Sequence, residues 1–182
     1  GELRTLLEDL GWALDFDDAG RAVGACHPQG RLAVFVGDLV DRGPDSPGVV
    51  RLVMGMVEQG SALCVSGNHE AKLVRALRGT TVTVSHGLAQ SLEQFGREPD
   101  QFRADALAFM DGLVAHYVLD DGRLVVAHAG LKEEYHGRTS ARVRAFALYG
   151  DTSGETDEYG LPVRYPWGQD YRGKAVVVYG HT

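Results

Sequence analysis

The sequence lacks the features that mark membrane proteins and disulfide scaffolds. No apolar run in its 182 residues approaches the roughly 20 residues that a membrane-spanning helix needs. No secretory signal opens the chain, and two cysteines, Cys26 and Cys64, are too few for a disulfide framework. These absences favour a globular protein of the reducing cytoplasm that has no membrane partner.

Positive charge is also scarce. The chain carries 18 Lys and Arg residues against 25 Asp and Glu residues, which gives a net charge of −7. Nonspecific duplex binding depends on many cationic contacts, so this balance argues against a surface that coats nucleic acid. It still permits a site that grips one phosphate at a chain end. A hydrophobic share of 44% is ordinary for a globular domain of this length.

Helical and strand-like patterns alternate in the first half of the chain and give way to a hairpin in the second. Helical spacing predicts helices near residues 3–12, 47–59, 70–78, 88–95, 100–112 and 140–148. Ser46 is expected to cap the second of these helices. Apolar runs predict strands at residues 32–36, 62–65 and 175–179, and a hairpin that joins residues 116–119 to 124–127. Residues 15–24 and 150–173 are predicted to be irregular. We therefore expect a mixed sheet with helices on its faces.

Residue types that bind metals follow the ends of successive predicted strands. Ligands of open α/β sheets bind outside the carboxyl ends of strands, so residues in these positions are expected to converge. Each residue alone could instead close a turn, cap a helix or sit at a sheet edge. Together, one carboxylate, one amide and two imidazoles suit Mn, Fe, Zn or Ni better than Ca or a thiolate cluster. The residues are Asp38, Asn68, His128 and His181.

The segments around these residues resemble those of calcineurin-like binuclear metallophosphoesterases. Gly-Asp-Leu-Val-Asp-Arg-Gly, Gly-Asn-His-Glu, Val-Ala-His-Ala-Gly and Gly-His-Thr match four of the five blocks of that superfamily, in order. They stand at residues 37–43, 67–70, 126–130 and 180–182. The resemblance implies an α/β fold with a central β-sandwich flanked by helices. The remaining block, Asp-x-His-Gly, is absent, so we expect residues 1–182 to be a phosphatase domain truncated at both ends.

The resemblance implies a metal site with two divalent ions. Asp38 resembles the carboxylate that bridges them, and Asn68, His128 and His181 resemble the other protein ligands of the second ion. The missing block would supply the terminal ligands of the first ion. Manganese is the expected metal, with Ni, Co, Fe or Zn as alternatives, and two such ions can share and activate one hydroxide.

The same resemblance assigns catalytic roles beside the metals. His69 resembles the imidazole that faces the leaving-group oxygen, and Asp41 resembles the carboxylate that orients it. Arg42 resembles the phosphate clamp, so Arg42, Asn68 and His69 are expected to contact substrate. A guanidinium can neutralise phosphate by paired hydrogen bonds, and a held imidazole can protonate the departing oxygen. No covalent intermediate is required, so neither cysteine need take part.

Residues 150–167 and 171–182 most resemble the phosphatase module of bacterial polynucleotide kinase-phosphatases. That resemblance implies removal of 3′-phosphate, 2′-phosphate or 2′,3′-cyclic phosphate from RNA or DNA ends in RNA repair. Kinase-like and ligase-like modules are then expected in the same polypeptide, outside residues 1–182. Aromatic residues interleaved with Arg164 and Arg172 could stack bases or merely pack a loop. They are Tyr135, Tyr149, Tyr159, Tyr165, Trp167 and Tyr171.

Other functions stay open. One is another enzyme of the superfamily, either a dinucleoside polyphosphate hydrolase or a protein serine/threonine phosphatase. Protein phosphatases usually carry arginine before Gly-Asn-His-Glu, where this chain has Ser66. Another is an inactive scaffold or dimerisation module, since the missing block leaves Asp38 alone at the first metal. A homodimer is therefore also open, and residues 1–182 alone are expected to show little or no activity.

Overall fold

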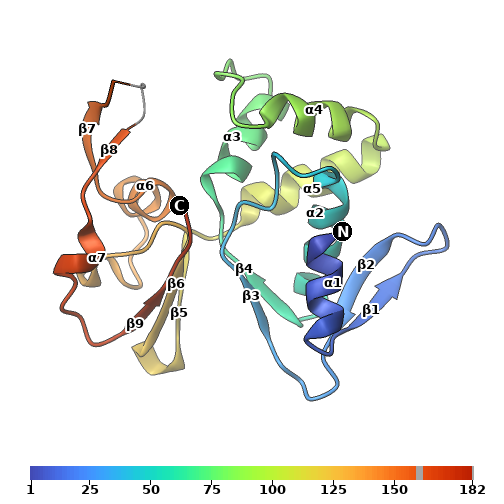
Figure 1. Ribbon diagram of the computed structural model, residues 1–182, viewed down its shortest axis with the longest axis horizontal. Coiled ribbons are helices and arrows are strands. Elements are labelled where there is room, and N and C mark those ends of the chain that lie inside the picture. The colour runs from blue at the N-terminus through green and yellow to red at the C-terminus, as the bar shows by residue number, and fades with distance from the viewer. Residues whose placement is uncertain (159–161, 182) are drawn as a thin grey trace.

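The computed structural model describes residues 1–158 and 162–181, which form two adjoining halves (Figure 1). The amino-terminal half, residues 1–112, is built on a parallel strand pair. β3 (Ala33–Phe35) pairs with β4 (Ala62–Cys64), and α2 (Ser46–Glu58) connects them. The other helices of this half are α1 (Glu2–Asp9), α3 (Asn68–Leu77), α4 (Leu88–Gly96) and α5 (Asp100–Gly112).

The carboxyl-terminal half, residues 113–181, contains a three-stranded sheet. β5 (His116–Leu119) pairs antiparallel with β6 (Leu124–Ala127), and β6 pairs parallel with β9 (Val176–Val178). The predicted hairpin and the mixed character of the sheet are thus confirmed. α6 (Ala141–Tyr149) begins after Ser140, whose hydroxyl accepts a hydrogen bond from the Val143 amide at 3.2 Å.

The prediction of a loop at residues 15–24 was wrong. β1 (Ala13–Phe16) and β2 (Ala22–Cys26) form an antiparallel hairpin, and Asp17 closes its turn by accepting from the amides of Ala19 and Arg21. The hairpin packs closely on α2, because a Cβ at Gly55 would come within 1.6 Å of a carbonyl oxygen of β2. Asp17 and Asp18 belong to the turn, whereas Asp15 lies within β1, and apolar residues on both sides of the turn supply most of the strands.

Two further expectations need correction. The predicted irregular stretch, residues 150–173, contains β7 (Thr152–Thr156), β8 (Pro162–Arg164) and the short helix α7 (Trp167–Asp170). Asp45, rather than Ser46, caps α2, since its side chain accepts from the Gly48 amide at 2.9 Å. No helix in the described ranges is long and apolar enough to cross a membrane.

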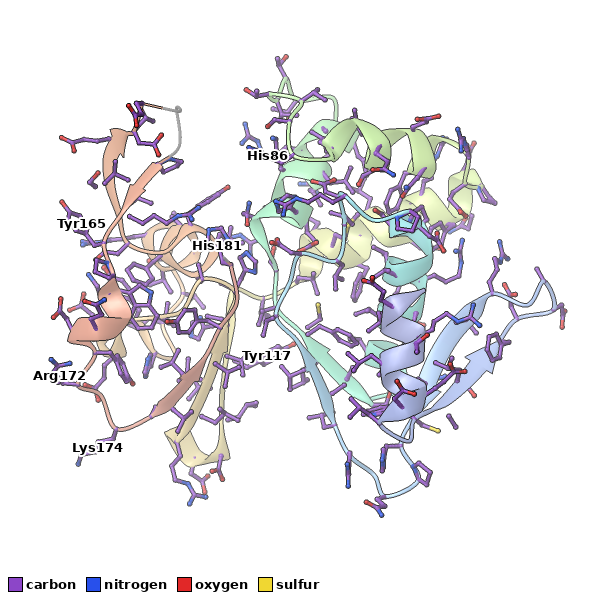
Figure 2. The ribbon with its side chains drawn as sticks, viewed as in Figure 1. His86, Tyr117, Tyr165, Arg172, Lys174 and His181 are labelled. Carbon is purple, nitrogen blue, oxygen red and sulfur yellow. The ribbon has the colours of Figure 1, made fainter. Side chains whose placement is uncertain are left out.

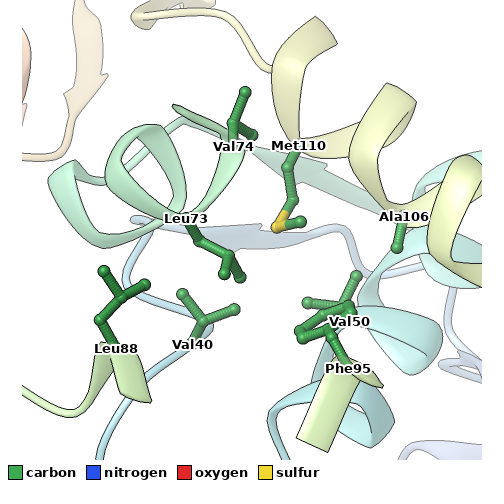
Figure 3. Packing of buried hydrophobic residues seen from close by; sticks show 8 residues of the cluster. All are labelled: Val40, Val50, Leu73, Val74, Leu88, Phe95, Ala106 and Met110. Atoms are coloured by element: carbon green, nitrogen blue, oxygen red, sulfur yellow. The ribbon is translucent and has the colours of Figure 1, made fainter. Parts of the chain in front are cut away.

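An apolar cluster fixes the loop that follows β3 (Figure 3). Val40 belongs to that loop and is 4% exposed, and it packs against residues of α2 to α5. Burial of each large apolar side chain contributes about 1.5–3 kcal/mol, so the loop is anchored at its centre. Residues 38–42 are therefore held between strand and helices. The cluster comprises Val40, Val50, Leu73, Val74, Leu88, Phe95, Ala106 and Met110.

Candidate active site

Four residues predicted from the sequence converge where the two halves meet. Asp38 follows β3, Asn68 opens α3, His128 follows β6 and His181 follows β9. Ligand atoms of Asp38, His128 and His181 all lie within 4.8 Å of one another. The Asn68 side-chain oxygen lies 2.9 Å from His128 Nε2. Figure 2 shows His181 at the border between the halves, so one site draws on both.

The orientation of His128 brings the lone pair of its Nε2 against the lone pairs of neighbouring oxygen atoms. Its Nδ1 lies 2.7 Å from the carbonyl oxygen of Val36, which can only accept, so Nδ1 carries the proton. On a neutral ring Nε2 is then unprotonated, and it faces oxygens of Asn68 at 2.9 Å and of Asp38 at 3.4 Å. A cation at this point would satisfy all three atoms, as in metal sites where a carbonyl orients the ligating imidazole.

His181 adds a second neutral imidazole. Burial, together with the neighbouring His128 and Arg164 side chains, lowers the pKa of His181 to about 4. At neutral pH the ring therefore keeps the uncharged form that binds metals. Its Nδ1 lies 2.8 Å from His128 Nε2, and its Nε2 is buried without a hydrogen-bond partner among the described residues. An unpartnered buried nitrogen beside this mixed set of nitrogen and oxygen donors fits a divalent transition metal.

Glu70 ties the two metal-bearing loops of the amino-terminal half together. Its side chain is fully buried and accepts from the amides of Gly67 at 2.8 Å, Asp38 at 2.9 Å and Leu39 at 2.6 Å. Burial raises the pKa of Glu70 to about 7, while these three N–H donors favour the ionised form. Glu70 belongs to the Gly-Asn-His-Glu segment, but the sequence pattern predicts no role for it.

The backbone around the site is strained. Asp38, Asp41, Arg42 and His181 all have positive φ, at 56°, 71°, 62° and 59°. This region is unfavourable for residues other than glycine and costs about 1–3 kcal/mol at each position. Such strain persists only where surrounding contacts enforce it. Glu70 and the buried Val40 supply those contacts for the loop after β3.

A hydrogen-bonded chain leads from α4 to His69. Ser91 donates to one carboxylate oxygen of Asp41 at 2.6 Å, and the other oxygen lies 2.6 Å from His69 Nδ1. The Asp41 amide also donates to the Ser91 hydroxyl at 2.9 Å. The bond to Asp41 raises the pKa of His69, which favours retention of its proton. Ser91 was missed because a single serine on a helix carries no motif.

Arg42 lies beside the free edge of the His69 ring. Its guanidinium nitrogen Nη2 is 3.3 Å from His69 Nε2. Arg42 itself is exposed, whereas His69 is 8% exposed. The two side chains therefore meet at the surface of the site, where an anion could contact both the guanidinium and the outer ring nitrogen.

The aromatic residues of the carboxyl-terminal half divide into two groups. Tyr135 and Trp167 pack against Phe146, and Tyr171 packs against Trp167, with the centroids of neighbouring rings 5.5–5.9 Å apart. Tyr149 and Tyr165 are exposed, and Tyr159 lies outside the described residues. The packing interpretation holds for the first group. Arg172 points away from the site in Figure 2 and donates to the carbonyls of Gln169 and Tyr171.

Comparison with known proteins identifies the family. Residues 9–182 match the calcineurin-like phosphoesterase family, and the chain belongs to it. The protein is therefore a hydrolase of the metallophosphoesterase class, for which divalent metal ions are implied. Both the expected fold and the expectation of an enzyme are confirmed.

Several curated relatives share one name, asymmetrical bis(5′-nucleosyl)-tetraphosphatase PrpE. The proteins of Geobacillus thermodenitrificans and Bacillus subtilis are each 42% identical over 185 residues, covering 100% of this chain and 73% of the relative. That of Geobacillus sp. is 44% identical over 160 residues, covering 86% of this chain. The chain thus spans 65–73% of the length of these relatives.

A solved structure agrees with the fold. The crystal structure of a protein described as a candidate diadenosine tetraphosphatase aligns with a TM-score of 0.59. The alignment covers 98% of this chain and 68% of that chain at 24% sequence identity, so it supports the fold alone.

The comparisons revise the expected subgroup. The relatives favour the dinucleoside polyphosphate alternative over polynucleotide kinase-phosphatase, and they give no support for RNA repair or for flanking kinase and ligase modules. Part of the segment that suggested polynucleotide ends, residues 159–161 and 182, lies outside the described residues.

Proposed function

We propose that the protein hydrolyses dinucleoside tetraphosphates off-centre and releases a nucleoside triphosphate and a nucleoside monophosphate. The observation that carries this proposal is 42% identity, over the whole chain, to relatives named asymmetrical bis(5′-nucleosyl)-tetraphosphatases. The convergence of a metal-binding cluster, an arginine and a held imidazole supports phosphate chemistry. Because the chain spans only part of those relatives, the activity is proposed for the complete protein.

In this proposal Asp38, Asn68, His128 and His181 hold one divalent metal, and Asp38 also reaches a second. Manganese is the metal we propose. Such ions polarise phosphate oxygens and acidify water. We propose that Asp38 also serves the second ion, and that the remaining ligands of this ion come from an Asp-x-His-Gly segment outside residues 1–182.

The residues beside the metal cluster divide the remaining work. Arg42 binds the phosphate through paired, charge-assisted hydrogen bonds. Water oxygen bonds to phosphorus, the bond between phosphorus and the bridging oxygen breaks, and His69 gives its proton to the departing oxygen. Asp41 holds the ring so that Nε2 faces the leaving group, and the 2.6 Å contact between Asp41 and His69 supports this assignment.

A substrate comparison tests the proposal. The complete protein, which includes the proposed Asp-x-His-Gly segment, is loaded with manganese and assayed on diadenosine tetraphosphate, a 3′-phosphorylated oligonucleotide and a phosphopeptide, and the products are separated by anion exchange. We expect the highest kcat/KM on the dinucleotide, with ATP and AMP in equal amounts. Preference for the oligonucleotide would restore the end-healing interpretation, and production of ADP alone would contradict off-centre cleavage. Inactivity on all three substrates with metal bound would favour the alternative that the protein is an inactive scaffold.

A further inference from the structure

A groove runs from the metal cluster across the carboxyl-terminal half. It begins as a cavity of about 390 Å³ whose lining includes His181, Arg164, Tyr149 and Tyr165. A second cavity of about 500 Å³ shares Tyr149 and Arg164 with the first and continues to Arg142. We call these two connected cavities the distal groove. It is the part of the described surface that joins a metal-ligand candidate to exposed aromatic rings.

The charges of the distal groove suit an anion. Its walls carry three cationic side chains, Lys132, Arg142 and Arg164, and the carboxylates of Asp151 and Glu155. Lys132 is engaged with Asp151 at 2.6 Å. Arg142 and Arg164 have no carboxylate partner among the described residues, although the whole chain has a net charge of −7. A cationic groove in an acidic protein raises the local concentration of polyanions.

The larger cavity on the other side of Asp38 suits an anion less well. It measures about 910 Å³ and lies between α1, α2 and the loop after β3. Its lining carries five carboxylates against four arginine side chains, and one of these, Arg51, is already paired with Glu98 at 2.6 Å. The contrast favours the distal groove as the path of a phosphate chain.

The aromatic side chains that line the distal groove are of two kinds, one held by contacts and the others exposed. Trp167 is fixed, since its indole N–H donates to the carbonyl of Ala129 at 3.2 Å and its ring lies 5.3 Å from that of Tyr179. Tyr149 is 41% exposed and Tyr165 is 56% exposed. Figure 2 shows Tyr165 on the same half as His181, at the outer side. Exposed rings beside cations are the usual platform for nucleobases.

We propose that the distal groove binds the nucleoside triphosphate portion of a dinucleoside tetraphosphate. Arg164 binds phosphates that are not being cleaved, and the ring of Tyr165 stacks on the distal base. This inference rests on the proposed function and deepens it. With one nucleoside and three phosphates seated in the groove, the metals meet the linkage to the remaining phosphate, so the cut falls off-centre.

Binding of ATP tests the groove without turnover. The protein has two tryptophans, Trp12 and Trp167, so in a Trp12→Phe background the fluorescence reports on Trp167 in the groove. Arg164→Gln should weaken ATP and tripolyphosphate binding by about tenfold, since charge-assisted hydrogen bonds are lost. Tyr165→Ala should weaken ATP binding alone. The matched control is Arg172→Gln, because Arg172 is exposed and lies outside both cavities.

Kinetics supply the second readout. Arg164→Gln should raise KM for diadenosine tetraphosphate about tenfold more than KM for p-nitrophenyl phosphate, which has no second phosphate. The proposed role of the distal groove would be overturned if Arg164→Gln and Arg172→Gln had equal effects on both substrates. It would also be overturned if Arg164→Gln left the affinity for ATP unchanged. If ATP binding depends on Arg164 but the wild type does not cleave the dinucleotide, the groove stands and the proposed function fails.

Discussion

The two halves of the molecule differ in how they hold their candidate site residues. In the amino-terminal half, buried Glu70 accepts hydrogen bonds from the amides of Asp38 at 2.9 Å and Leu39 at 2.6 Å. Buried Ser91 donates to Asp41 at 2.6 Å, and Asp41 in turn contacts His69 at 2.6 Å. In the carboxyl-terminal half, His181 stands at the mouth of an open groove with exposed side chains. On the proposals above, the amino-terminal half positions His69 and Arg42, while the carboxyl-terminal half supplies two metal ligands and binds the remainder of the substrate.

The largest effect is expected at the residue that both metal ions would share. Asp38→Ala should lower kcat by roughly 10³-fold or more on every phosphate ester, because metal charge stabilises the transition state by several kcal/mol. Bound manganese, measured by atomic absorption after gel filtration, should fall in parallel. Retained activity with normal metal content would remove Asp38 from the centre of the site.

The next effect separates acid catalysis from metal binding. His69→Ala should slow hydrolysis of phenyl phosphate by about 10²–10⁴-fold, because general acids contribute that much when the departing oxygen is basic. The loss on p-nitrophenyl phosphate should be far smaller, since p-nitrophenolate leaves without protonation. Metal content should stay at the wild-type level. Equal losses on both esters would reject the proton-donor role.

A third prediction concerns the buried carboxylate that joins the metal-bearing loops. In either orientation, Glu70→Gln places an amide N–H₂ against at least one backbone N–H donor, because both carboxylate oxygens accept backbone hydrogen bonds. The free energy of unfolding should therefore fall by about 1–3 kcal/mol. Manganese affinity should fall about 10–100-fold, as for residues that orient metal ligands. Glu98→Gln is the matched control, because it breaks the ion pair with Arg51 away from the cluster. If both variants bind metal alike, Glu70 has only a packing role.

A smaller effect is expected at Ser91, where the hydrogen-bonded chain that leads to His69 begins. Ser91→Ala removes the donor to Asp41 and should slow phenyl phosphate hydrolysis about tenfold, with less effect on p-nitrophenyl phosphate. Ser46→Ala is the control, because the Ser46 hydroxyl lies 3.3 Å from that of Ser91 and has no hydrogen bond to Asp41 among the described contacts. Uniform loss on both esters would mean that Ser91 merely supports the fold.

The smallest effect is expected at the thiols. Cys26 is exposed and Cys64 is buried at 1% exposure, where burial raises the pKa of the Cys64 thiol. Alkylation of the native protein should therefore modify Cys26 alone and leave kcat unchanged. Mass spectrometry counts the modified thiols, and Cys26→Ser is the control. Inactivation that this variant prevents would implicate the thiol in the reaction.

The sequence predicted the parts of the site that follow strands. Asp38, Asn68, His128 and His181 could be found because parallel strands carry their carboxyl ends to one edge, and a short apolar run marks each strand. Glu70 and Ser91 could not be given roles, because their function lies in contacts with residues 31 to 50 positions away. Such contacts depend on how helices pack, which local patterns do not encode.

The fold was predictable to a similar extent. Helices with apolar spacing, such as α2 and α5, were recovered nearly to the residue, and so was the β5–β6 hairpin. The β1–β2 hairpin was missed because the acidic residues of its turn dominate a short window, while its strands gain stability from packing on α2. Tertiary contacts thus overrode local composition there.

Location of the bound metal tests the account most directly. A crystal of the manganese-loaded protein, measured at the manganese absorption edge, gives an anomalous peak wherever the ion lies. We predict a peak within about 2.0–2.4 Å of side-chain atoms from Asp38, Asn68, His128 and His181. This is the range for oxygen and nitrogen ligands of divalent ions. A peak elsewhere, or one from which either histidine is absent, would contradict it.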